Sequence, residues 1–61
     1  MFEEFIGKNV KYIYTDSGRT FCAFGVLIAE SDGFIKINDK KRGLMIINFS
    51  NIQRVELDAS L

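Results

Sequence analysis

The sequence predicts an all-β fold in which five short strands form a small, strongly bent barrel with a short N-terminal helical turn. Alternating or apolar runs of strand length recur along the chain with polar turns between them, and no long helical pattern occurs. A glycine, Gly25, also lies inside the longest apolar run, Phe21–Ala29. Because an interior strand glycine marks a bend or a close backbone approach, we expect this strand to curve as a very small barrel requires.

The length of 61 residues predicts a single domain, residues 1–61, near the lower limit for independent folding. A core of this size rarely contributes more than about 3–5 kcal/mol, so small folds often add disulfides, metals or association. The single cysteine, Cys22, cannot form an internal disulfide, and the absence of histidine removes the usual zinc spacings. We expect Cys22 to be a small buried hydrophobic residue. We also expect that the chain binds no metal or other cofactor and that homo-oligomerisation stabilises it.

The N-terminal part of the chain predicts a helical turn and a first strand. Met1–Ile6 has apolar residues at helical spacing, which indicates one turn across the open end of the barrel, and Gly7 ends it. Lys8–Tyr14 alternates, with one face formed by Val10, Tyr12 and Tyr14. We expect the two tyrosines to be half-buried with their hydroxyl groups in water. Thr15–Gly18 is a turn by composition.

The second strand, Phe21–Ala29, is apolar on both faces. One face consists of Ala23, Gly25 and Leu27, and the other of Cys22, Phe24, Val26 and Ile28. A strand so poor in polar residues has both faces covered, and we expect Phe21 and Phe24 to pack inside the molecule. The cover for the second face is the N-terminal turn, a strand after the bend or a neighbouring subunit.

The remaining elements are shorter. They are a turn at Ser31–Gly33, a strand at Phe34–Asn38, a basic hairpin loop at Asp39–Gly43, an apolar strand at Leu44–Ile47, a polar turn at Asn48–Asn51 and a last strand at Ile52–Leu57. In the third strand, the alternation predicts that Ile35 and Ile37 face inward.

Eight basic and eight acidic residues give zero net charge, which argues against bulk electrostatic attraction to nucleic acid. Basic residues do cluster at Lys36 and at Lys40–Arg42, a pattern that by itself is typical of a solvated hairpin end. The acidic N-terminus lacks the apolar core of a signal peptide, and no apolar run reaches the length of a bilayer span. We therefore expect a cytoplasmic protein without membrane contact.

No residue pattern indicates catalysis. Cys22 has no histidine to activate it, and Glu30 and Asp32 are ordinary turn formers. The dispersed glycines match no phosphate-binding loop, so we predict that the chain is not an enzyme. Binding remains, and two aromatic residues that border or lie in turns, Phe34 and Phe49, are either base-stacking platforms or caps of the barrel mouth.

Three short motifs follow one another between Phe5 and Leu57. They are Phe5-Ile6-Gly7-Lys8-Asn9-Val10, then Gly25-Val26-Leu27 with Asp32, then Ile46-Ile47 with Ser50-Asn51-Ile52. The series resembles the Sm-like family, the ring-forming RNA-binding proteins that include bacterial Hfq and archaeal Sm-like proteins. The resemblance implies a strongly bent SH3-like or Sm-like small barrel and a ring in which the fourth strand pairs with a neighbour's fifth.

The resemblance also implies a site for single-stranded RNA. Counted from Asp32, the family's binding positions fall on Phe34, Lys36 and Asn48. Phe34 would stack on a base, Lys36 would hold a phosphate or a base edge, and Asn48 would hydrogen-bond the base. Counting from Gly25 instead moves the first two positions to Gly33 and Ile35. We prefer the first register because it keeps Ile35 facing inward.

The chain departs from the family pattern where the base is read. Lys36 or Ile35 replaces the reading asparagine, Asn48 replaces the arginine, and Phe49 replaces the glycine that follows it. The long spacing between Arg19 and Gly25 implies a longer hairpin or a bulge. The resemblance therefore implies the fold but not recognition of uridine.

Two functions follow as hypotheses. The first is an Sm-like homo-oligomer that binds single-stranded RNA through Phe34, Lys36 and Asn48. The second is a protein-interaction or structural assembly module on the same barrel, whose strand edges accept a partner's strand. The second is favoured if the three side chains do not converge on one exposed rim. A nucleotide or metabolite sensor has no support beyond the fold.

Overall fold

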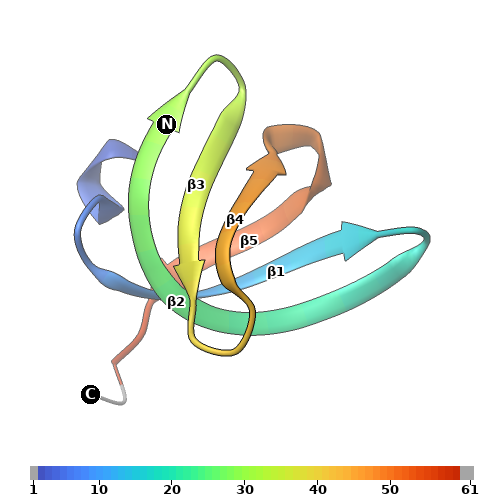
Figure 1. Ribbon diagram of the computed structural model, residues 1–61, viewed down its shortest axis with the longest axis horizontal. Helices are drawn as coiled ribbons and strands as arrows, with labels where there is room; N and C mark the ends of the chain where they lie inside the picture. Colours follow the sequence, from blue (N-terminus) through green and yellow to red (C-terminus); the bar gives the residue numbers. More distant parts are fainter. Residues whose placement is uncertain (1, 60–61) are drawn as a thin grey trace.

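The computed structural model describes residues 2–59, in which five antiparallel strands form one sheet of order β4-β3-β2-β1-β5 (Figure 1). The elements are η1 (Glu3–Phe5), β1 (Asn9–Asp16), β2 (Arg19–Ser31), β3 (Phe34–Asp39), β4 (Gly43–Asn48), η2 (Phe49–Asn51) and β5 (Ile52–Leu57). The prediction of an all-β fold after an N-terminal turn is confirmed, the turn being a 3₁₀ turn. The sheet is not closed, because β4 and β5 are its two edges.

The long strand β2 bends strongly and pairs with β1 along its first half and with β3 along its second (Figure 1). Gly25 lies at the crossover, opposite both Val10 and Asp39. A Cβ atom on Gly25 would lie 2.5 Å from the carbonyl oxygen of Asn38 and 2.9 Å from the Cα of Asp39. The close backbone approach predicted at this glycine is therefore present. A register shift between Leu27 and Ala29 adds a bulge to the bend.

The core lies on the concave side of the curved sheet. Its fully or nearly fully buried apolar side chains are Val10, Tyr12, Tyr14, Ala23, Leu27, Ile35, Ile37 and Ile47. These residues alternate with exposed ones along β3 and with partly buried ones along β1, which confirms the predicted inward faces of both strands. Phe2 and Phe5 of the N-terminal segment pack against the same core.

Two hairpins are set by local turn chemistry. Ser17 and Gly18 between β1 and β2, and Asp32 and Gly33 between β2 and β3, all have positive φ. Two-residue hairpin turns of type I′ require this conformation, and Gly and Asp tolerate it. The turn of the first hairpin is shorter than predicted, because Asp16 pairs with Arg19 and leaves Ser17–Gly18 as the turn in place of Thr15–Gly18.

The predicted cover of the second face of β2 is only partly present. Gly7 donates a backbone hydrogen bond to Leu27 (2.7 Å), and the backbone N–H of Phe2 donates to the carboxylate of Glu30. The N-terminal segment therefore hydrogen-bonds to the later part of β2, but Ile28 on the second face is still 42% exposed. Cys22 and Phe24 lie beyond it and are exposed, Phe24 by 40%. The prediction that Cys22 and Phe24 are buried is wrong, because no segment within residues 2–59 packs over this part of the second face.

Candidate functional site

The outer face of the sheet, formed by the side chains of β2, β3 and β4 that point away from the core, carries the three predicted site residues. Phe34 pairs with Asn48 across β3 and β4, and Lys36 pairs with Ile46. All four side chains are exposed, Phe34 by 44%. Directly opposed residues of an antiparallel pair have Cβ atoms about 4.5–5.5 Å apart, so Phe34 and Asn48 lie side by side. The structure brings Phe34, Lys36 and Asn48 together on one exposed face.

Phe34 borders two shallow hollows. The first, of about 360 Å³, is apolar and is lined by Ala29, Ser31, Asp32, Phe34, Ile35, Lys36 and Ile46. The second, of about 340 Å³, has more polar lining, from Tyr14, Thr15, Asp16, Phe34, Met45, Ile46, Ile47, Asn48 and Asn51. A flat ring that borders an apolar hollow and a polar one offers a stacking surface with hydrogen-bonding groups beside it. Asp32 places a carboxylate in the same hollow as Lys36.

The β2–β3 turn and the β4–β5 connection meet beside Phe34. The backbone N–H of Phe49 donates to the carbonyl oxygen of Gly33 at 2.8 Å. The Phe49 ring packs edge-on against Phe2, with centroids 5.4 Å apart and planes at 81°, and is only partly exposed. Of the two turn aromatics, Phe34 is therefore the exposed platform and Phe49 is a packing residue.

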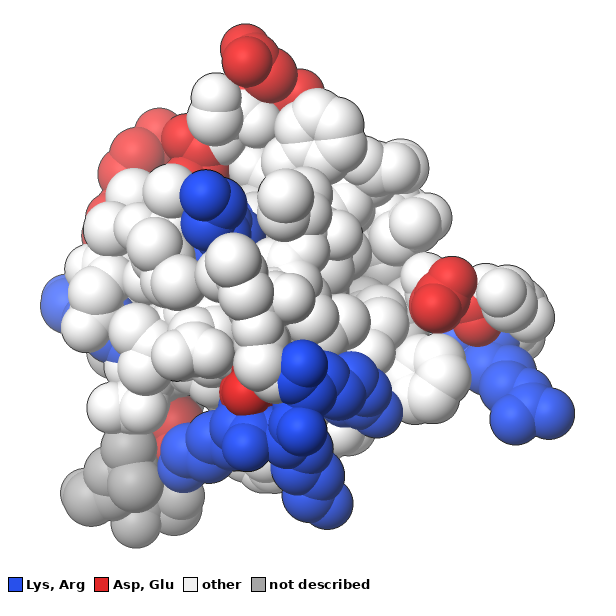
Figure 2. All heavy atoms as spheres, in the orientation of Figure 1, with Lys and Arg blue, Asp and Glu red and all other residues white. Residues whose placement is uncertain are grey.

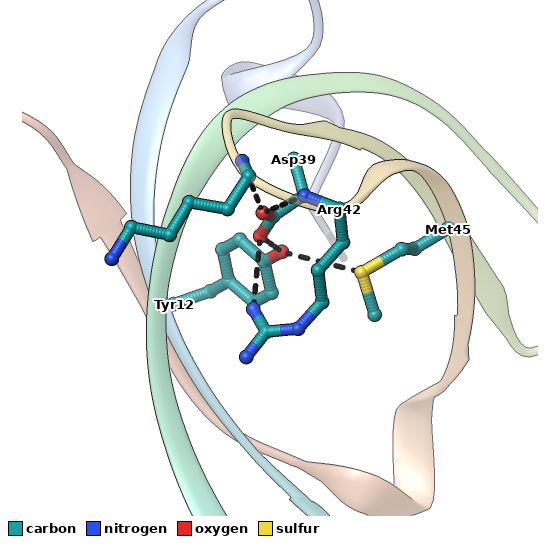
Figure 3. Close-up of polar contacts among 5 residues, drawn as sticks. Tyr12, Asp39, Arg42 and Met45 are labelled. Atoms are coloured by element: carbon teal, nitrogen blue, oxygen red, sulfur yellow. Dashed lines mark hydrogen bonds and ion pairs between the residues drawn. The ribbon is translucent and has the colours of Figure 1, made fainter.

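A buried carboxylate at the other end of β3 was not predicted as a structural feature. Asp39 is 4% exposed and accepts a hydrogen bond on Oδ2 from the hydroxyl of Tyr12 (Figure 3). Its Oδ1 accepts the backbone N–H groups of Lys41 (2.8 Å) and Arg42 (2.9 Å). The prediction of a solvated Tyr12 hydroxyl is wrong, because Tyr12 crosses the core to reach Asp39. An aspartate at the start of a tight loop was the available sequence sign, since Asp commonly accepts backbone N–H groups two and three residues on.

The charges of this cluster follow from its geometry. Burial by itself raises the pKa of Asp39, but the hydrogen bonds from Tyr12 and from the backbone of Arg42 and Lys41 outweigh it and leave the pKa below its ordinary value. The guanidinium Nη1 of Arg42 lies 3.8 Å from Oδ2. Burial, together with the hydrogen bond to Asp39, raises the pKa of Tyr12. The cluster therefore holds an ionised aspartate beside a neutral tyrosine and fixes the loop to the core.

The neutral net charge of the chain conceals a strong local asymmetry. Figure 2 shows basic residues gathered at the β3–β4 loop and acidic residues gathered at the opposite end, near η1 and the β2–β3 turn. The basic group is Lys40, Lys41 and Arg42, and the acidic group is Glu3, Glu4, Glu30 and Asp32. Phe34 lies at the acidic end of β3 and Asp39 at the basic end.

The two edge strands differ in composition. β4 has no charged residue, and Leu44 and Ile46 are each 63% exposed. β5 carries Arg54 and Glu56, which form an ion pair at 2.9 Å. Exposed edges without charge or proline are templates for pairing with another chain. Of the two edges, β4 is therefore the one better suited to pair with a strand of another chain.

Within residues 2–59, no helix has the length and hydropathy to cross a membrane, and no group of His, Cys, Asp and Glu side chains is placed to hold a metal ion. The resemblance to the Sm-like family is carried by the motifs in the sequence. Comparison with family models, with curated proteins and with solved structures finds no match to this chain.

Proposed function

We propose that the chain is a divergent Sm-like subunit of a cytoplasmic homo-oligomeric ring that binds single-stranded RNA. The observation that carries the proposal is the convergence of Phe34, Lys36 and Asn48 on one exposed face. The aromatic side chain of Phe34 offers base stacking, the ammonium group of Lys36 a phosphate contact and the carboxamide of Asn48 hydrogen bonds to a base edge. These are the contacts by which single-stranded RNA is recognised. Repetition of this site around a ring would turn modest contacts into avid binding.

The sheet order supports the Sm-like assignment. In the family, rings form by pairing of the fourth strand with a neighbour's fifth, and here β4 and β5 are the two free edges. The sharp bend of β2 at Gly25 is what a small barrel of this kind requires. Pairing of β4 with the β5 of another copy would also cover part of the apolar surface at Leu44 and Ile46.

Assembly is tested with Ile46→Lys. Ile46 is largely exposed, so the variant should change the free energy of unfolding of the single subunit by no more than about 0.5 kcal/mol. It places a charge on the β4 edge, so the mass measured by light scattering should fall toward that of one chain. Thr20→Lys adds the same charge at an exposed position of β2 away from this edge and should assemble normally. A wild-type protein that is folded and monomeric in dilute solution would contradict the ring.

RNA binding is tested by titrating labelled single-stranded oligoribonucleotides at low and moderate salt. Phe34→Ala should weaken binding by about 1–3 kcal/mol because a stacked base is lost, whereas Phe34→Tyr should retain it. Asn48→Ala should change the preference among bases more than the affinity for any one of them. Absence of wild-type binding at low salt, where phosphate contacts are strongest, would exclude the RNA function.

The second candidate is a protein-interaction module that accepts a partner's strand. It is favoured by the apolar lining of the hollow beside Ile46 and by the carboxylate of Asp32 within it. The two functions separate in one measurement. A wild type that assembles but binds no oligonucleotide would exclude the RNA function and favour the interaction or assembly module.

A further inference from the structure

The β3–β4 loop forms a small basic hollow at the end of the molecule away from Phe34. Its lining residues are Cys22, Ala23, Phe24, Asp39, Lys40, Lys41 and Arg42, and its volume is about 180 Å³. Three cations and one carboxylate leave a local net charge of +2. The ring of Phe24, on the outer face, is exposed by 40% beside these cations.

The cations of this hollow differ in how they are engaged. Arg42 lies 5.4 Å from the centroid of the Phe21 ring and 3.8 Å from the carboxylate of Asp39, so part of its interaction is within the chain. Within residues 2–59, no ion pair involves the ammonium groups of Lys40 and Lys41. The backbone N–H groups of Lys41 and Arg42 are bonded to Asp39, which fixes the path of the loop from which the side chains extend.

A nucleic-acid strand bound at Phe34 alone would meet a single cation, Lys36. Lys36 is the basic residue of that hollow, and Asp32 offsets it. Affinity for a nucleic acid depends chiefly on phosphate contacts, which also set the register of the strand, whereas base contacts set its specificity. More cations lie at the loop, about 17 Å from Phe34 along β3 at the usual rise of about 3.3 Å per residue.

The outer face joins the two ends. Phe24 of β2 faces the same side as Lys36 and Phe34, and the cross-strand neighbours Val26 and Asn38 lie between them. A sugar–phosphate backbone that lies along this face would pass from Phe34 over Lys36 to the β3–β4 loop. Basic side chains that follow a backbone, interleaved with rings on which bases stack, are the arrangement used for single strands.

We infer that the basic loop hollow is a second contact site for single-stranded nucleic acid, in which Lys40, Lys41 and Arg42 bind backbone phosphates and Phe24 stacks on a base. The inference rests on the proposed binding of single-stranded RNA and assigns different contacts to the two ends of β3. The loop anchors the backbone, and Phe34 with Asn48 reads bases. An anionic membrane surface is the competing partner, but the hollow is concave and presents a single exposed ring.

The first test measures binding of a mixed-sequence single-stranded oligoribonucleotide over a range of salt concentrations. The slope of log affinity against log salt changes by about 0.7 for each phosphate contact on a single strand. Lys40→Gln/Lys41→Gln should therefore reduce the slope by about 1.4. Lys8→Gln/Arg19→Gln removes the same charge at exposed positions elsewhere and should leave the slope nearly unchanged. Equal slopes for the two double variants would overturn the inference.

The second test separates failure of this site from failure of the site at Phe34. The backbone amide resonances of the wild type are followed by NMR during titration with the same oligonucleotide. Shifts at both Phe24 and Lys40–Arg42 support the inference, with or without shifts at Phe34. Shifts confined to Phe34, Lys36 and Asn48 overturn it and leave the proposed function standing. Shifts at neither place overturn both.

Two further measurements test the stacking role of Phe24 and the alternative of a membrane partner. Phe24→Ala should weaken binding by about fivefold or more with an unchanged salt slope, because a stacking contact is lost and no cation is removed. Vesicles containing phosphatidylserine should bind the wild type and Lys40→Gln/Lys41→Gln equally weakly. Vesicle binding that depends on these lysines, without an effect on the oligonucleotide, would assign the loop to membranes and overturn the inference.

Discussion

The two ends of strand β3 are held in different ways. At the Asp39 end, a buried carboxylate joins the β3–β4 loop to Tyr12 in the core, whereas at the Phe34 end the conformation of the β2–β3 turn follows mainly from its own residues. Asp32 and Gly33 adopt positive φ, and Gly33 accepts a backbone hydrogen bond from Phe49. The loop end thus depends on a buried contact with the core, and the Phe34 end on local turn chemistry with one backbone hydrogen bond from the β4–β5 connection. Substitutions at the two ends should therefore have different consequences for stability.

The largest expected difference is between two glycines. At the loop end, Gly25→Ala places a Cβ within 3.0 Å of the backbone of Asn38 and Asp39, which cannot move without shifting β3. We expect a loss of about 1–3 kcal/mol or more in the free energy of unfolding, a large part of what so small a core supplies. Chemical denaturation measures it.

Gly33→Asn is the matched change at the Phe34 end. A Cβ on Gly33 meets no atom within 4 Å, and Asn tolerates positive φ better than other side chains, so the loss should stay below about 1 kcal/mol. Equal losses for Gly25→Ala and Gly33→Asn would contradict the distinction between the two ends.

A loss no larger than that of Gly25→Ala is expected for Tyr12→Phe, which leaves the carboxylate of Asp39 without its hydroxyl donor. An unfulfilled buried acceptor costs about 1–3 kcal/mol, measurable as a lower denaturation midpoint. Tyr14→Phe removes a hydroxyl from an equally buried tyrosine of the same strand that does not contact Asp39. If both variants unfold at the same denaturant concentration, Asp39 does not depend on Tyr12.

The smallest effect concerns pH. Because the pKa of Asp39 is lower in the folded chain than its ordinary value of 3.8, the ionised carboxylate contributes its full stabilisation of the folded chain above that pH. It should be lost as the pH falls through the folded-state pKa. Thermal unfolding between neutral pH and about pH 2 should show this loss in the wild type and a smaller one in Asp39→Asn, which has no carboxylate to protonate. The same pH dependence in both proteins would assign the acid sensitivity to other carboxylates.

Much of the fold could be predicted because it is encoded in neighbouring residues. The alternation in β3, the turn residues Asp32 and Gly33, and the interior glycine Gly25 each specify local geometry. The same alternation placed Phe34 and Lys36 on one face, and the antiparallel register then placed Asn48 beside them. The exposure of Cys22 and Phe24 could not be predicted, because an apolar pattern shows that a strand face is apolar but not whether another segment packs over it.

By itself, the sequence determined the five strands, the turns between them, the bend and the side of β3 on which Phe34 and Lys36 lie, because all of these follow from periodicity and from the conformational range of single residues. Only the tertiary structure decided that Tyr12 meets Asp39 and that the cations gather beside Phe24 at one end. It also decided that the sheet stays open at β4 and β5. These features join residues far apart in the chain, and the curvature of the whole sheet fixes which of them meet.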